Sequence, residues 1–132
     1  MTKQVFSPST IAAPFGAYSH GVLVESPGRW LFTSGQLAIS KGGAIPESAL
    51  EQARLCFHNV REILAQAAMT PADVVRIGAF VTDRAHFAEY MAARDEFVEG
   101  AAPASTLLIV GGFTRPEFKV EVEVLAFAAP NR

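Results

Sequence analysis

The chain of 132 residues is half apolar and 18% charged, which is typical of one globular domain, residues 1–132, with a core of its own. Eleven Lys and Arg against thirteen Asp and Glu give a net charge of −2, which disfavours nucleic-acid binding. The single cysteine excludes an internal disulfide framework. With no signal-peptide pattern and no apolar run of about 20 residues, we expect a cytoplasmic protein that does not enter a membrane.

The N-terminal part predicts an irregular arm followed by a hairpin. Prolines and glycines interrupt residues 1–16, which leaves room for one short edge strand. Residues 21–25 and 30–36 are predicted strands, and the Pro-Gly pair in residues 26–29 suits a type II turn between them. Gly35, at the end of the second strand, is expected to relieve a bulge or to admit a close approach to the backbone.

Two helices and a buried strand follow. Apolar residues recur at helical spacing over residues 48–68, and Cys56 flanks that stripe, so we interpret Cys56 as a packing residue rather than a nucleophile. Residues 74–82 are almost continuously apolar, which predicts a central strand covered on both faces. Asp83 is a candidate N-cap for a second helix that runs to residue 98. One side of this helix carries Phe87, Met91, Arg94 and Val98.

Residues 103–128 predict a second hairpin, made of an apolar segment at 105–110 and an alternating segment at 119–126. The face expected to join the core carries Val120, Val122, Val124 and Ala126. The opposite face carries Glu121 and Glu123. Such carboxylates are commonly solvated, and the alternative is that they line a polar pocket or a subunit interface.

The predicted order of elements is β-β-α-β-α-β-β, which favours an α+β fold with two helices on one face of a mixed sheet. Strand alternation does not allow all the large apolar side chains to face the helices. The residues concerned are Trp30, Phe32, Leu125 and Phe127. Because a domain of this size has nothing left to cover the other face, we expect identical chains to associate.

Well-known catalytic patterns are absent from the sequence. The three histidines stand far apart and there is only one cysteine, so no metal ligand set is predicted. There is neither a Gly-rich phosphate loop nor a nucleophile-elbow motif. The remaining candidates are polar residues at strand ends or beside Gly and Pro, each of which also suits a purely structural role. These candidates are Tyr18, Ser34, Ser105 and Glu121.

Several short motifs, taken together and in order, resemble the Rid family, also called YjgF and formerly L-PSP endoribonuclease. The motifs are Gly16-Ala17-Tyr18-Ser19-His20-Gly21, Phe32-Thr33-Ser34-Gly35-Gln36, Gln52 with Asn59, Val74-Val75-Arg76, Phe80-Val81-Thr82-Asp83, Phe87, Pro103-Ala104 and Glu121-Val122-Glu123-Val124-Leu125-Ala126. The resemblance covers nearly the whole chain. It implies a chorismate-mutase-like fold, a homotrimer around a barrel-like centre, and three small-molecule pockets between subunits. It implies no cofactor.

The resemblance also implies a reaction and site residues. Family pockets hydrolyse reactive imines and enamines, typically 2-imino acids, to keto compounds and ammonia. By resemblance, Tyr18 and Phe87 shape the pocket, Ser34 and Gly35 form its wall, and Glu121 orients or activates water.

Two positions depart from the family pattern. Ser105 stands where active deaminases carry an arginine that clamps the substrate carboxylate, and serine offers no charged fork. Met91 similarly replaces a family asparagine. We therefore expect the pocket to bind a smaller, less acidic or different imine. Arg29 and Arg115 are candidates to replace the missing charge, and the alternative is that both are simply solvated. The alternatives are a non-catalytic ligand-binding or regulatory trimer and, less favoured by the charge balance, a ribonuclease.

Overall fold

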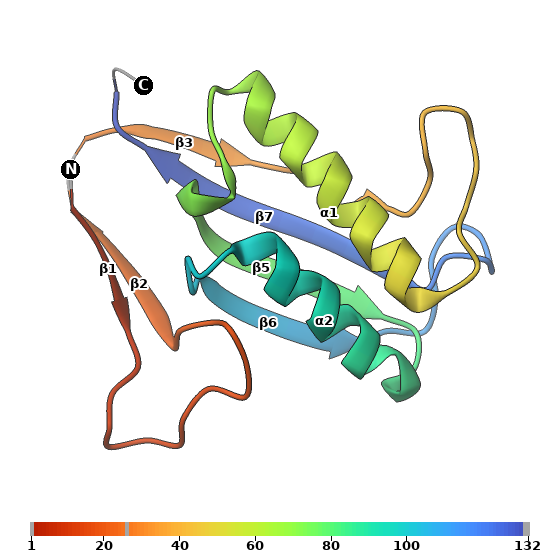
Figure 1. Ribbon diagram of the computed structural model, residues 1–132, viewed down its shortest axis with the longest axis horizontal. Helices are drawn as coiled ribbons and strands as arrows, with labels where there is room; N and C mark the ends of the chain where they lie inside the picture. Colours follow the sequence, from red (N-terminus) through yellow and green to blue (C-terminus); the bar gives the residue numbers. More distant parts are fainter. Residues whose placement is uncertain (1, 26, 131–132) are drawn as a thin grey trace.

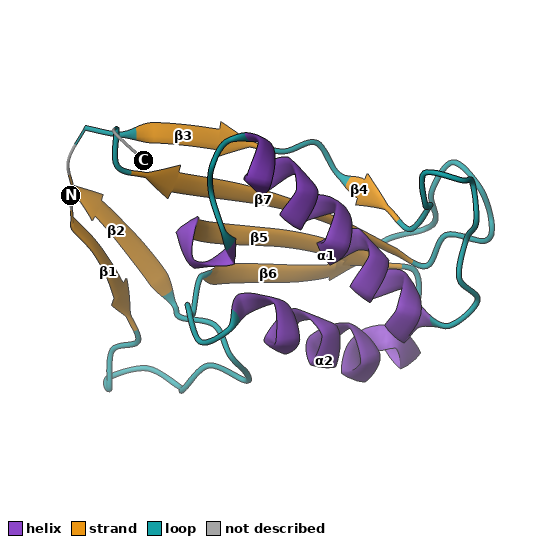
Figure 2. Ribbon diagram, turned by 45° about the horizontal axis from the view of Figure 1, so that its top comes forward, coloured by secondary structure: helices purple, strands orange, loops and turns teal. Residues whose placement is uncertain are grey.

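Two helices lie side by side across one face of a five-stranded sheet, and a two-stranded ribbon extends from one end of it (Figure 1). The computed structural model describes residues 2–25 and 27–130. The α+β class and the placement of both helices on one face confirm the predicted architecture (Figure 2). The predicted turn at residues 26–29 includes Ser26, which lies outside the described residues.

The sheet has the strand order β3-β7-β5-β6, with the short β4 also paired to β7. The strands are β3 (Arg29–Phe32), β4 (Gln36–Leu37), β5 (Val74–Val81), β6 (Ala104–Ile109) and β7 (Val120–Ala128). Strands β5 and β6 are parallel, whereas β7 is antiparallel to β3, β4 and β5. The predicted hairpin at residues 103–128 is therefore wrong. A helical crossover places β6 on the outer edge of β5, so the chain must pass to the far side of β5 before β7 can pair.

The predicted hairpin at residues 21–36 is also wrong. Strand β2 (Gly21–Glu25) pairs with β1 (Thr2–Phe6), the short strand for which the arm left room, and the two form a separate ribbon. Strand β3 instead pairs with β7. The strand predicted at residues 30–36 is interrupted between β3 and β4. Phe32 pairs with Leu125 and Gln36 pairs with Val122, so three residues between Phe32 and Gln36 lie opposite only two residues of β7. One extra residue therefore forms a bulge beside Gly35, as the sequence allowed.

Helix α1 (Ala49–Gln66) begins where predicted, because Ser48 Oγ accepts a hydrogen bond from the Glu51 N–H at 3.1 Å. Asp83 does act as a cap, but it caps a 3₁₀ turn at Arg84–His86, which leads into α2 (Phe87–Val98). Helix α2 ends at a left-handed Glu99, with φ of 50°.

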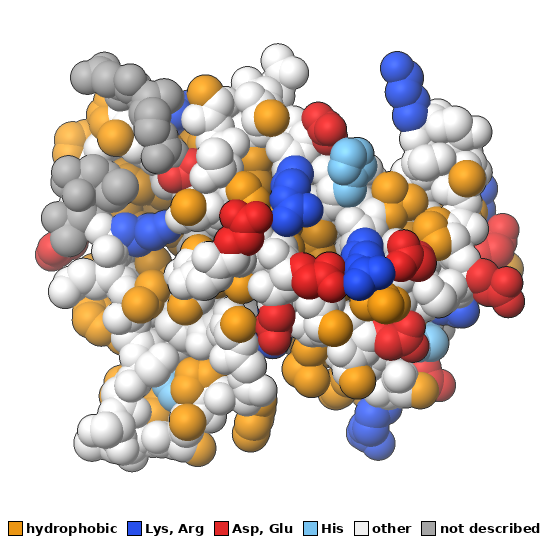
Figure 3. Space-filling view, in the orientation of Figure 1, with side chains coloured by type: hydrophobic (Ala, Val, Ile, Leu, Met, Phe, Trp, Pro, Cys, Tyr) orange, Lys and Arg blue, Asp and Glu red, His pale blue; other side chains and the backbone are white. Residues whose placement is uncertain are grey.

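The hydrophobic core fills the space between the helices and the sheet. The predicted inward face of β7 is buried there, and its members Val120, Val122, Val124 and Ala126 are all at most 4% exposed. Phe57 of α1 stacks on Phe97 of α2 with ring centroids 4.6 Å apart, which joins the two helices. Figure 3 shows that the outer, helical side carries acidic and basic side chains close together, with apolar ones between them.

The second face of the sheet is incompletely covered. Trp30 is 48% exposed and Phe32 is 75% exposed. Phe127 is an exception to the prediction, because its side chain is completely buried. Gly28 lies close against its ring, and the Trp30 ring centroid is 4.6 Å away. No helix in the described part of the chain is long and apolar enough to cross a membrane.

Candidate functional site

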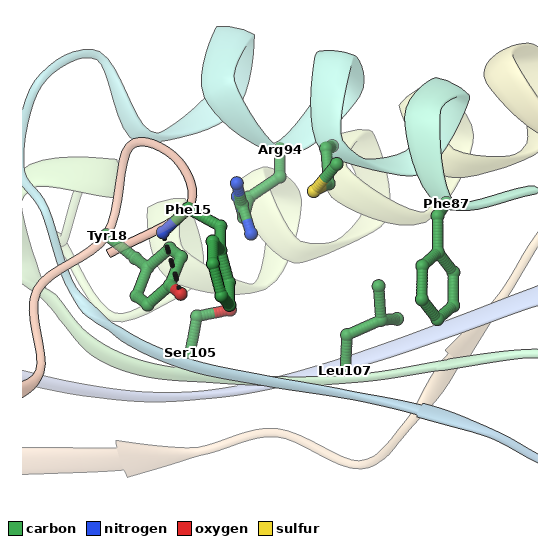
Figure 4. A pocket seen from close by; sticks show the side chains of 7 residues that line it. Phe15, Tyr18, Phe87, Arg94, Ser105 and Leu107 are labelled. Atoms are coloured by element: carbon green, nitrogen blue, oxygen red, sulfur yellow. Dashed lines mark hydrogen bonds between the residues drawn. The ribbon is translucent and has the colours of Figure 1, made fainter. Parts of the chain in front are cut away.

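A cavity of about 390 Å³ lies between α2, β6 and the N-terminal arm (Figure 4). The residues that line it are Phe15, Tyr18, Phe87, Met91, Arg94, Ser105 and Leu107. Three of the residues singled out in the sequence, Tyr18, Phe87 and Ser105, are therefore brought together. The walls are mostly apolar with few polar groups, which is the usual character of a small-molecule site.

The arm reaches the cavity because backbone and side-chain hydrogen bonds hold its loop against the sheet edge. The Ser19 N–H donates to the Pro103 carbonyl at 3.0 Å, which docks the arm beside the start of β6. The Tyr18 hydroxyl accepts from the Phe15 N–H at 3.0 Å and so closes the loop that carries both rings. Tyr18 is thus an organising residue as well as a wall of the cavity.

Arg94 is a charged cavity residue that the sequence analysis did not select as a site candidate. It is only 3% exposed, and its guanidinium carbon lies 5.2 Å from the centre of the Tyr18 ring. The signal was present, since Arg94 shares an otherwise apolar side of the helix with Phe87 and Met91. A charge on such a stripe is expected to be paired or functional.

Unsatisfied polar atoms gather around this arginine. Among the described residues, three buried side-chain polar atoms lack a hydrogen-bond partner, namely Tyr90 Oη, Arg94 Nη2 and Ser105 Oγ. Arg94 and Ser105 both line the cavity, and the guanidinium carbon lies 5.9 Å from the centre of the Tyr90 ring. Burial raises the pKa of Tyr90, against the opposing effects of the Arg94 charge and of the neighbouring Ser105 side chain, so the phenol keeps its proton at neutral pH.

Glu121 does not belong to this cavity, because strand register places it on the opposite face of the sheet. Ser105 pairs with Ile77, which pairs with Val124, and this row faces the helices. Glu121 pairs with Phe80, which pairs with Leu108, in a row on the other face.

The surroundings of Glu121 bring the remaining predicted residues together. An added Cβ at Gly35 would lie 2.6 Å from the Glu121 carboxyl carbon and 2.9 Å from both carboxylate oxygens, so the bulge lies directly against the acid. Ser34 adjoins this contact, exposed, and its carbonyl accepts from Gln36 Nε2 at 3.1 Å. Burial, with a smaller contribution from the Glu123 charge, raises the pKa of Glu121.

Neither arginine suggested as a replacement for the family clamp lines the cavity. Arg29 Nη1 donates to the Ala67 carbonyl at 2.8 Å, so Arg29 ties the end of α1 to β3. Arg115 is exposed, with its guanidinium carbon 5.9 Å from the centre of the Phe118 ring.

Cys56 is a packing residue, as predicted. Its side chain is completely buried, its Sγ lies 3.6 Å from the Val120 carbonyl oxygen, and burial raises its pKa to about 12. A thiol so rarely ionised at neutral pH does not serve as a nucleophile. No group of three or more His, Cys, Asp or Glu side chains suited to a metal occurs among the described residues.

Comparisons with known proteins converge on one family. The family model described as "Endoribonuclease L-PSP" matches residues 9–128. The chain shares 35% sequence identity with YyfB from Yersinia pestis, a protein of unknown function in the Rid family. The crystal structure of YyfB matches with a TM-score of 0.87, over 97% of this chain and 100% of the YyfB chain. A 2-iminobutanoate/2-iminopropanoate deaminase from Rattus norvegicus is 28% identical over 97% of this chain and 92% of its own length. Escherichia coli TdcF with bound serine is 25% identical with a TM-score of 0.72, over 96% and 99% of the two chains.

Proposed function

Because the chain belongs to the Rid (YjgF, L-PSP) family, we propose that it hydrolyses reactive imines or enamines in a pocket formed where copies of the chain meet. Similarity to an imine deaminase over 97% of the chain supports the reaction class. The observation that carries the proposal is the division of the predicted site. Tyr18, Phe87 and Ser105 lie on the helical side of the sheet, whereas Glu121 lies with Gly35 on the other.

Association is the way in which these two halves become one site. A single sheet cannot present both faces to one small molecule, so the acid of one copy must approach the cavity of another. The exposed Trp30 and Phe32 beside the Glu121 half favour such an interface. Following the family resemblance, we propose a homotrimer with three equivalent pockets.

The chemistry requires an activated water and a place for its proton. The Glu121 carboxylate accepts a proton from water while the water oxygen bonds to the imine carbon and the C=N pair moves to nitrogen. The acid then returns the proton to nitrogen, which gives a neutral carbinolamine. The carboxylate next takes the proton of the carbinolamine hydroxyl and passes it to the nitrogen, so the C–N bond breaks, the C=O bond forms and ammonia leaves. A carboxyl whose pKa is raised toward neutral, as that of Glu121 is, suits both steps.

An assay that generates the imine in place tests this proposal. An amino-acid oxidase supplies a 2-imino acid, threonine dehydratase supplies an enamine, and the rate of ammonia release is followed with and without the protein. Glu121→Gln should reduce any acceleration by about 100-fold or more. Glu123→Gln is the matched control, since it should retain activity and shift the pH profile downward by removing a charge that raises the pKa of Glu121.

Oligomeric state is measured on the same samples. Sedimentation of the wild-type protein as a trimer at micromolar concentration supports the shared pocket, and Phe32→Asp should weaken association and activity together. A stable monomer with full activity would contradict the proposal.

A non-catalytic ligand-binding trimer is the second candidate, favoured by the uncharged Ser105 in place of the family arginine. In that case imine decay is not accelerated, Ser105→Arg creates no acceleration, and a small molecule still binds. Ribonuclease activity, suggested by the older family description, is the third and least favoured, because the net charge of −2 gives RNA little to bind.

A further inference from the structure

The polar end of the cavity is built from hydrogen-bond donors. A guanidinium has five N–H donors and no acceptor. Arg94 Nε donates to Asp95 Oδ1 at 3.1 Å, and Nη2 lies 3.1 Å from that same oxygen but outside hydrogen-bonding geometry. Asp95, itself 45% exposed, therefore satisfies one edge of the guanidinium only.

The rest of the guanidinium faces the cavity. Figure 4 shows it projecting from α2 on the side of Phe15 and Tyr18, toward Ser105. Nη2 lies against Gly16, where a side chain would collide with it, and is buried without a hydrogen bond. Buried donors are rarely left unsatisfied. The Ser105 hydroxyl, which also lines the cavity, interacts with the Tyr90 side chain but makes no hydrogen bond of good geometry. A bound acceptor would satisfy both residues.

The charge balance and the walls restrict what that acceptor is. Among the described residues that line the cavity, Arg94 alone is charged, and Asp95 already offsets part of its charge. This favours a monoanion over a phosphate dianion. A carboxylate matches the flat guanidinium, and the side chains of Phe87, Met91 and Leu107 would contact an apolar body.

We propose that Arg94 determines ligand specificity by binding the carboxylate of a small ligand with a branched or aromatic apolar body, with Ser105 as a second donor. As an assignment of the substrate class, this proposal rests on the proposed function. Its claim that Arg94 binds a carboxylate is separate and can be tested with ligands that are not imines. It also revises the expectation that Ser105 makes the pocket select a less acidic ligand, because the cation comes from the helix instead of the strand.

The test measures binding of two probes of nearly equal shape, 4-methylpentanoate and its neutral amide, 4-methylpentanamide, by calorimetry on the intact protein. The wild-type protein should bind the acid at least tenfold more tightly than the amide. Arg94→Met should weaken acid binding by about 10- to 100-fold, the usual effect of losing a charge-assisted hydrogen-bond pair, and leave amide binding nearly unchanged. Arg61→Met is the matched control and should change neither affinity, since that guanidinium also lies over a ring, 5.2 Å from the centre of Phe97, but outside the cavity.

Equal binding of acid and amide, no binding of the acid at millimolar concentration, or full acid binding by Arg94→Met overturns the inference. Should Arg94→Met fail to fold, Asp95→Asn decides, because removing the competing negative charge at an exposed position leaves more of the Arg94 charge to the ligand and should strengthen acid binding severalfold. Unchanged binding by that variant contradicts the inference. If Arg94 binds the acid but the protein does not hydrolyse imines, the inference is supported and the proposed function is refuted. If the protein hydrolyses imines equally well with and without Arg94, the proposed function is supported and the inference is refuted.

Discussion

Replacing Gly35 with alanine should displace the Glu121 carboxylate without otherwise disturbing the fold. The new Cβ would lie 2.6 Å from the carboxyl carbon, whereas an ordinary carbon–carbon contact is ~3.5–4.0 Å, so the carboxyl group must retreat by about 1 Å. Gly35 does not have a positive φ, so alanine suits the backbone. The obstacle is the end of a flexible side chain, and the stability cost should stay near 1 kcal/mol.

The functional cost should be much larger than the structural one. A misplacement of about 1 Å in a catalytic group commonly costs about 100-fold in rate, so imine hydrolysis by Gly35→Ala should fall to that extent with a nearly unchanged melting temperature. Displacement toward solvent should also return the pKa of Glu121 toward its ordinary value, which an NMR titration of the carboxyl carbon measures. Gly42→Ala, where the nearest atom is 4.0 Å away, is the matched control. Wild-type activity together with an unchanged Glu121 pKa would show that the contact does not position the acid.

Three further predictions concern stability and reactivity. Burial raises the folded-state pKa of Glu121, so ionising this carboxyl destabilises the fold. Glu121→Gln should therefore raise the melting temperature at neutral pH, and the gain should disappear as the pH falls toward 4.5. A gain that does not change with pH would contradict this prediction. Gln52→Leu should cost about 3 kcal/mol in urea unfolding, because the buried amide makes three 2.8 Å hydrogen bonds to the backbone of Pro46, Glu117 and Lys119, whereas Gln36→Leu should cost much less. Cys56 should react with a thiol reagent only at the rate of unfolding, and rapid labelling of the native protein would refute its burial.

Local patterns predicted the elements well, but strand partners depended on distant parts of the chain. The stripe of α1 and the alternation of β7 each follow from one short segment. Both hairpin predictions assumed that consecutive strands pair, which is only a tendency. Strand β2 instead pairs with the arm, and β5 separates β6 from β7, so long-range closure decided the topology.

The candidate site likewise combines features that local patterns predicted with features that depend on distant parts of the chain. Tyr18, Phe87 and Ser105 were selected from motifs and do share one cavity, and the bulge expected at Gly35 does lie against Glu121. That these are two groups on opposite faces became clear only from the register, because a one-residue difference in pairing reverses the face. Arg94 was seen as part of a helix stripe, yet its unsatisfied nitrogen is a property of tertiary packing that sequence alone does not contain.

The alternation that separates Ser105 from Glu121 has a genetic consequence. If each reaction centre takes one half from each of two neighbours, two defective alleles can rescue one another. Co-expressing a chain damaged only at Glu121 with one damaged only on the cavity side would restore about a quarter of the centres in randomly mixed assemblies. Neither allele alone would restore any, and a site confined to one polypeptide would show no such complementation.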